Sequence, residues 1–89
     1  MSSSTLEVHV VAADREVWAG EATMLVARTT EGELGILPGH EPLLGVLASG
    51  EVRIHTADNG IILAKADGGF LSVEHNTVMV VASQAELAA

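Results

Sequence analysis

Apolar and polar side chains alternate along much of this 89-residue chain, with the period of β-strands that bury one face. Residues 6–10 and 52–55 show the alternation most clearly. Residues 22–29, 61–66, 70–74 and 78–82 are more continuously apolar and rich in strand-forming side chains. A further short strand is expected at Val17 and Trp18. The pattern therefore predicts a succession of short strands.

Residues that favour turns separate these segments. The run Asp58-Asn59-Gly60 is the clearest hairpin signal, because Asn-Gly suits a tight turn with positive φ at both central residues. Residues 43–47 are compatible with a strand or with a helical turn, and Pro42 and Gly45 favour the strand because they bracket the segment too closely for a stable helix. No amphipathic segment is long enough for a crossover helix. We therefore expect an all-β fold, a flattened antiparallel β-sandwich or barrel of about eight to ten short strands.

The chain is short enough for one domain only. We expect residues 1–4, which are rich in serine, to form a disordered N-terminal tail, and residues 5–83 to form the β-sandwich domain. Residues 84–89 are expected to be a short C-terminal stub, either helical or frayed. No internal repeat or linker divides the chain.

Composition narrows the range of functions. Apolar residues make up 48% of the chain but aromatic residues only 2%, which predicts an aliphatic core and argues against platforms that stack sugars or single-stranded nucleic acid. The formal net charge of −8 repels phosphate backbones and anionic lipid headgroups. We therefore expect no nucleic-acid partner and no direct lipid insertion. A basic or polar protein surface is the favoured partner, and a soluble, cytosolic location is expected because no long apolar run is present.

Residues 31–42 are the most informative stretch, since they contain three glycines, both prolines and a histidine. Such residues specify one chain path rather than a loose connection. Glu31, Glu33, Glu41 and His40 lie on that path. We expect an exposed loop that displays polar groups to a partner, with Glu33 and His40 both accessible.

Catalysis and metal binding are not favoured by the residues. The four histidines are far apart in the sequence and the chain has no cysteine, so no metal site is expected. Ser49, Ser72 and Ser83 lack the frame of a nucleophile elbow. We expect no catalytic residue and no cofactor. One alternative remains, a small all-β carrier domain that presents a modified Lys65, the single lysine, at a hairpin tip.

Three ordered motifs resemble a known family. They are residues 31–44 (EGELGILPGHEPLL), residues 50–54 (GEVRI) and residues 67–73 (DGGFLSV). Together they are similar to the epsilon subunit of F-type ATP synthases, over about residues 5 to 83. The resemblance implies a flattened β-sandwich and a non-catalytic rotor subunit at the cytoplasmic face of the cell membrane. In that role it would join the gamma subunit to the c-ring.

The resemblance also implies contact residues. Glu31, Glu33, Gly35 and His40 match the loop that faces the polar loops of the c-ring. The gamma-facing surface is expected to include the residues Ala12, Leu43, Leu44 and Gly45. Family members typically continue into a helical hairpin that inhibits ATP hydrolysis. The sequence ends at Ala89, so no inhibitory or nucleotide-sensing role is expected from these residues.

Overall fold

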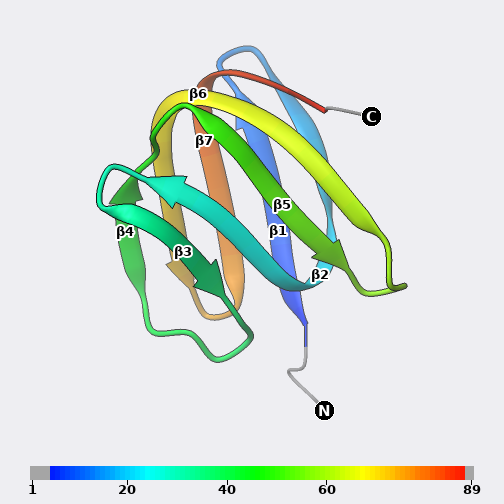
Figure 1. Cartoon of the computed structure of the whole chain (residues 1–89). Helices are drawn as coiled ribbons and strands as arrows, with labels where there is room; N and C mark the ends of the chain where they lie inside the picture. The colour runs from blue at the N-terminus through cyan, green and yellow to red at the C-terminus, as the bar shows by residue number, and fades with distance from the viewer. Residues whose placement is uncertain (1–4, 88–89) are drawn as a thin grey trace.

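The computed structural model describes residues 5–87, and these residues form seven strands without a helix (Figure 1). The strands are β1 (Leu6–Ala12), β2 (Arg15–Thr29), β3 (Gly32–Ile36), β4 (Leu43–Val46), β5 (Gly50–Thr56), β6 (Ile61–Glu74) and β7 (Thr77–Leu87). Within this described part, no helix is available to cross a membrane. The predicted all-β fold is confirmed, and residues 43–46 are a strand rather than a helical turn.

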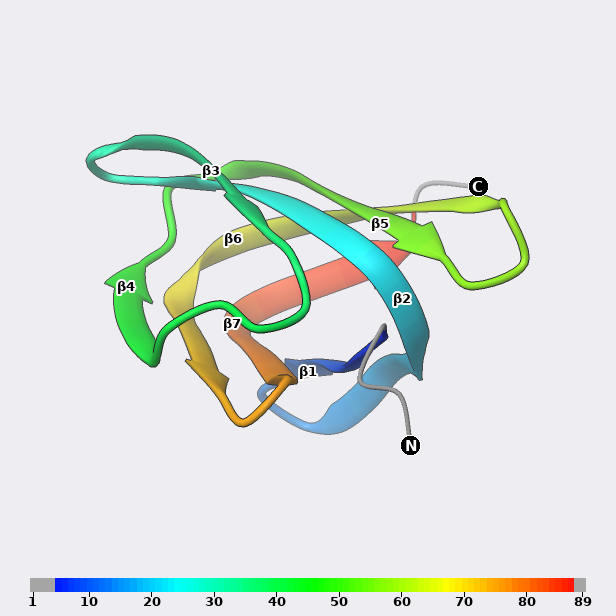
Figure 2. The same cartoon turned by 90° about the horizontal axis from the view of Figure 1, so that it is seen from below.

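The strands form one sheet that closes on itself. The order is β1-β7-β6-β5-β2-β3, and the additional pairing of β1 with β2 closes the first five strands of this order into a ring (Figure 2). β3 extends the sheet beyond β2, and β4 pairs with β6 outside the main path. The molecule measures 35 × 26 × 21 Å along its principal axes, so the closed sheet is flattened.

The structure has fewer strands than the eight to ten that the sequence predicted, because two strands are long. β2 includes both the expected strand at Val17 and Trp18 and the one that follows Gly20. β6 continues through Gly68 and Gly69, which have φ of 71° and 116°. Glycine at positive φ bends a strand without ending it, so β6 pairs with β5 before the bend and with β4 after it.

Three local expectations differ from the structure. β1 and β7 pair in parallel, so the sheet is not wholly antiparallel. β7 continues to Leu87 in register with β6, so residues 84–87 are strand rather than helix or frayed end. At the β5–β6 hairpin only Asn59 has positive φ, because the loop is longer than a two-residue turn and the last pair is His55 with Ile61. Residues 1–4 and the last two residues of the expected stub lie outside the described residues.

The core is entirely aliphatic, as the composition predicted. Its largest completely buried side chains are Leu6, Leu25, Ile36, Ile54 and Leu71, with several valines between them. No polar or charged residue is buried within the described part of the chain. Trp18 packs half-buried against this core, whereas Phe70 lies outside it and is 54% exposed. The buried core cluster therefore contains neither aromatic residue.

Candidate functional site

An acidic turn connects β2 to β3. The Thr29 hydroxyl accepts a hydrogen bond from the Glu31 N–H (3.1 Å) and donates one to the Gly32 carbonyl (2.9 Å). Gly32 has a φ of 123°, a conformation that glycine adopts without steric cost. The carboxylates of Glu31 and Glu33 project from this turn as exposed side chains. A locally fixed backbone therefore carries two negative charges into solvent.

His40 lies at the other end of β3 from this turn. The five residues of β3 lie between the acidic turn and the loop that contains His40, and at 3.3 Å per residue they span about 16 Å. The His40 side chain is half-buried, and its Nδ1 is 2.7 Å from the Glu41 carbonyl oxygen. The neighbouring Gly39 N–H donates to the Asn76 side-chain oxygen at 2.7 Å, which ties the loop to the β6–β7 turn.

The polar loop predicted from the sequence is therefore divided in space. Glu31 and Glu33 lie together at the acidic turn, and exposed Gly35 lies along β3 between that turn and His40. His40 was expected to be exposed, and that expectation is wrong. The sequence pattern did not show the separation, because it did not reveal that residues 32–36 form an extended strand.

An outer apolar row, defined here as Val46, Phe70, Val81 and Val11, crosses four neighbouring strands. Each residue lies opposite the next, with Val46 paired to Phe70, Phe70 to Val81, and Val81 to Val11. Opposed residues of a pleated sheet point to the same face. Val46, Phe70 and Val81 are 52%, 54% and 39% exposed. The row is therefore a continuous apolar stripe on the outside of the molecule.

Leu44 enlarges this stripe. It is 73% exposed and pairs with Ser72, which lies opposite Met79 on β7. A monomeric protein rarely exposes a contiguous group of large apolar side chains, so this face has the character of a contact surface.

The gamma-facing residues expected from the sequence differ in what they expose. Leu44 belongs to the outer stripe, whereas Leu43 packs half-buried against the core. Gly45 carries no side chain, and Ala12 is only 7% exposed at the end of β1. Of these four, Leu44 alone offers a large apolar side chain.

Sequence reasoning missed Val46, Phe70 and Val81 as candidate contacts. A signal for Val81 was present, because residues 78–82 are apolar without alternation, and such a strand has apolar side chains on both faces. Phe70 and Val46 gave no such signal. Their position beside Val81 follows only from the pairing of β4, β6 and β7.

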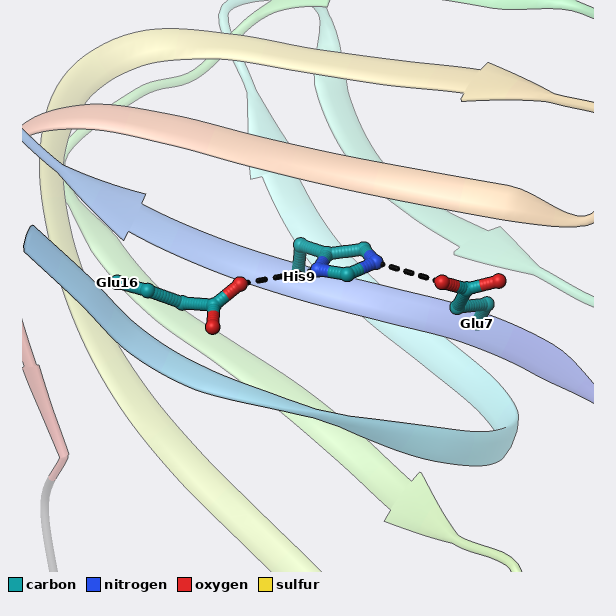
Figure 3. A network of polar contacts seen from close by, with 3 residues as sticks. All are labelled: Glu7, His9 and Glu16. Atoms are coloured by element: carbon teal, nitrogen blue, oxygen red, sulfur yellow. Dashed lines mark hydrogen bonds and ion pairs between the residues drawn. The ribbon is translucent and has the colours of Figure 1, made fainter.

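A charged group on β1 and β2 consists of Glu7, His9 and Glu16 (Figure 3). The His9 ring lies between two carboxylates, with Nδ1 3.0 Å from Glu16 and Nε2 2.9 Å from Glu7. The hydrogen bond to Glu16, and then the one to Glu7, raise the pKa of His9 above its ordinary value. Because His9 lies opposite Met79 and Glu16 lies opposite Val11, this group forms a polar rim to the stripe.

The position of Lys65 does not support the carrier alternative. Lys65 lies within β6, opposite Glu51 of β5 and Glu86 of β7, and not at a hairpin tip. A lysine that carries a swinging group needs a protruding turn, and Lys65 lies in the interior of a strand that is paired on both sides. Within residues 5–87, no group of three or more histidine, aspartate or glutamate side chains has a geometry that could hold a metal ion.

Comparison with known sequences gives a family match. Residues 5–88 match the family model described as the β-sandwich domain of the ATP synthase delta/epsilon chain. The ATP synthase epsilon chain of Streptomyces coelicolor is 55% identical over 85 residues, which cover 96% of this chain and 68% of that protein. The ATP synthase epsilon chain of Micrococcus luteus is 49% identical over 82 residues, which cover 92% of this chain and 90% of that protein.

Solved structures share the fold at lower identity. A chain of the Euglena gracilis mitochondrial ATP synthase, solved as OSCP/F1/c-ring, superposes with a TM-score of 0.89 at 23% identity. The match covers 94% of this chain but only 54% of the Euglena chain. A chain from the central stalk and c-ring of the Tetrahymena thermophila mitochondrial ATP synthase has a TM-score of 0.75 at 21% identity. At these levels of identity, the two matches show that the fold is shared and nothing beyond the fold.

Proposed function

This chain belongs to the ATP synthase delta/epsilon β-sandwich family, and from that membership we propose that it is a non-catalytic subunit of the central stalk. In this role it holds the gamma subunit against the c-ring during proton-driven ATP synthesis. Its place is at the cytoplasmic face of the cell membrane, within the complex. The single observation that carries the proposal beyond family membership is the outer apolar row together with Leu44.

The outer stripe supports a contact with the gamma subunit. An interface between two rotor subunits must persist while torque is transmitted. Lasting interfaces bury a large apolar centre inside a polar rim. Val46, Phe70 and Val81 supply that centre, and the group around His9 supplies a rim. Leu44 extends the centre along β4, because it lies two residues from Val46 and on the same face of the strand. Ala12 contributes little to this surface, because its side chain is buried.

The acidic turn supports a contact with the polar loops of the c-ring. Glu31 and Glu33 are exposed, and their backbone is fixed by the Thr29 hydroxyl. Carboxylates held in this way suit charge-assisted hydrogen bonds to cationic or amide groups. Gly35 lies on the same strand and leaves the approach open, since an added Cβ there would meet no described residue within 4 Å. We assign His40 to the opposite end of β3, where it shapes the loop before β4.

Co-purification with the gamma subunit tests the first contact. We expect Phe70→Ser to weaken the gamma complex by at least roughly tenfold, because it removes an aromatic ring from the middle of the stripe. Ile61→Ser is the matched control, since Ile61 is similarly exposed at 56% but lies on the β5–β6 hairpin. Equal binding by both variants would contradict the assigned surface.

Assembly on the membrane sector tests the second contact. We expect Glu33→Gln to reduce proton pumping driven by ATP in membrane vesicles while leaving binding to gamma unchanged. Glu51→Gln removes an exposed carboxylate from β5 and serves as the control. His40→Ala should affect the ring contact less than Glu33→Gln, because the two side chains lie at opposite ends of β3. Normal coupling by the Glu33 variant would count against the acidic turn.

A further inference from the structure

The closed sheet contains two strands with a free edge. Within residues 5–87, β3 pairs only with β2, and β4 pairs only with β6. A strand with one partner leaves a row of backbone N–H and C=O groups available for another strand. Both free edges occur on neighbouring segments of the chain, since β3 and β4 are joined by the loop that contains His40 (Figure 1).

These two edges border the same groove. Residues 29–34 line one side and residues 43–46 line the other, around a volume of about 390 Å³. One end is closed, because the Thr30 N–H donates to the Val46 carbonyl at 3.0 Å and Thr29 bridges to Leu47. Leu34 and Leu43 face the interior and pack against the core, so the floor of the groove is apolar.

Backbone groups of β4 point toward this groove. The Val46 carbonyl is directed away from β6, because its partner is Thr30, whereas the Leu47 N–H bonds to Gly69 on β6. Since alternate residues of a strand direct their backbone groups to the same side, the N–H and C=O of Leu44 also face away from β6. On β3, alternate residues likewise direct theirs away from β2.

The charges around the groove are of one sign. Among residues 5–87, Glu31 and Glu33 are its only ionisable lining residues, and no lysine or arginine lines it. Free edges of natural sheets are commonly protected by a lysine, a proline or a bulge. β3 has no lysine, proline or bulge, and its single charged side chain, Glu33, repels an acidic strand but attracts a basic one.

We propose that the free edge of β3 receives an extended segment of a neighbouring subunit as an added β-strand, and that this segment alternates basic and apolar residues. We derive this alternation from the side chains of β3, since Glu33 points to solvent while Leu34 and Ile36 point inward. Side chains of an added strand point to the same two faces as those of β3. Basic side chains of the added strand lie beside Glu33, and apolar ones cover Leu34. The inference rests on the proposed function for the identity of the donor as a subunit of the complex, and it specifies the chemistry of the contact.

A synthetic segment tests the chemistry in the isolated chain. The probe is a seven-residue peptide of alternating lysine and valine, and the control peptide has the same sequence with N-methyl groups on its valine amides. We expect the first peptide to slow hydrogen exchange at the outward amides of β3. The methylated peptide should bind at least roughly tenfold more weakly, because it lacks the donors of a strand. Equal binding of the two peptides, or no protection on β3, would overturn the proposal.

Variants of the chain separate strand addition from simple charge attraction. Glu33→Gln should weaken the peptide and reduce the salt dependence of its binding, whereas Glu51→Gln, on β5, should change neither. If both variants weaken the peptide equally, the attraction is that of the whole acidic surface and the proposal fails.

Hydrogen exchange in the assembled ATP synthase tests the donor. Strand addition predicts that the outward amides of β3 are slower to exchange in the complex than in the isolated chain. If the chain assembles but these amides exchange at the same rate in both, the further inference fails and the proposed function stands. If the chain does not assemble with gamma and the c-ring, the proposed function fails. In that case, binding of the lysine–valine peptide to the isolated chain still shows whether the edge of β3 accepts an added strand.

Discussion

Phe70 and Leu71 are neighbours on β6 that point to opposite faces of the sheet. Phe70 is 54% exposed in the outer stripe, whereas Leu71 is completely buried in the core. Strand geometry sets this contrast, because successive side chains of a pleated strand alternate between faces. Adjacent positions in the sequence thus lie in different environments, with Phe70 available to a partner and Leu71 packed in the core.

Truncation of these two residues should separate stability from binding. We expect Leu71→Ala to lower the free energy of unfolding by about 2 to 5 kcal/mol, since it leaves a cavity in an aliphatic core. Phe70→Ala should change stability by much less, because its ring is largely in solvent, but should weaken the contact with gamma. Urea unfolding and co-purification measure the two effects. A large loss of stability in the Phe70 variant would show that its ring packs within the fold.

The bend in β6 depends on Gly69. A Cβ on Gly69 would overlap the Val81 carbonyl oxygen and approach the Ala82 Cα at 2.7 Å, and the residue has a φ of 116°. We therefore expect Gly69→Ala to destabilise the domain by about 1 to 3 kcal/mol or more, since both contacts are with backbone that cannot easily move. The measurement is thermal or urea unfolding.

Gly35→Ala is the matched control for that substitution. Gly35 lies on β3, and an added Cβ would meet no atom of residues 5–87 within 4 Å. We expect its effect on stability to be smaller than about 0.5 kcal/mol. If Gly35→Ala destabilised the domain as much as Gly69→Ala, the loss at Gly69 could not be assigned to the close approach of β6 and β7.

The His9 network should make stability depend on pH. The pKa of His9 is raised by hydrogen bonds to Glu16 and Glu7, so the folded state binds the proton more tightly than the unfolded state. Its contribution to stability is fully present below the ordinary histidine pKa of 6.5, and it is lost as the pH rises through the higher folded value. We therefore expect His9→Gln to destabilise the domain at pH 5.5 and to have little effect at pH 8.5.

Urea unfolding of the His9 variant at both pH values measures this effect. His55→Gln is the control, because the His55 side chain makes no ion pair within residues 5–87. The loss of stability caused by His9→Gln at pH 5.5 should be small and should decrease in high salt, since His9 and both carboxylates are accessible to solvent. A larger effect at pH 8.5 than at pH 5.5 would contradict the assigned network.

The acidic turn should be stabilised by one hydroxyl. Thr29→Val keeps the shape of the side chain but removes the hydrogen bonds to the Glu31 N–H and the Gly32 carbonyl. We expect a loss of about 0.5 to 1.5 kcal/mol in stability and faster hydrogen exchange at Glu31. The ring contact should weaken with it, because Glu31 and Glu33 would no longer be held in place. Unchanged exchange at Glu31 would show that the turn does not need the hydroxyl.

The sequence by itself determined the fold class and much of the local structure. Alternation at residues 6–10 and 52–55 fixed which side chains are buried, because only one register places the apolar side chains inside. The scarcity of aromatic residues determined an aliphatic core, and the glycines and prolines of residues 31–42 marked the segment that contains the acidic turn. The motif resemblance to the epsilon family was confirmed by the family match.

Tertiary structure alone decided which surface residues lie together. Strand pairing aligned Val46, Phe70 and Val81, although they are distant in the sequence, and no local pattern specifies such a pairing. The same pairing placed Glu33 and His40 at opposite ends of β3 and left the edges of β3 and β4 free. Local propensity acts over a few residues, whereas a contact surface depends on the register between distant strands, and that register is set by packing of the whole core.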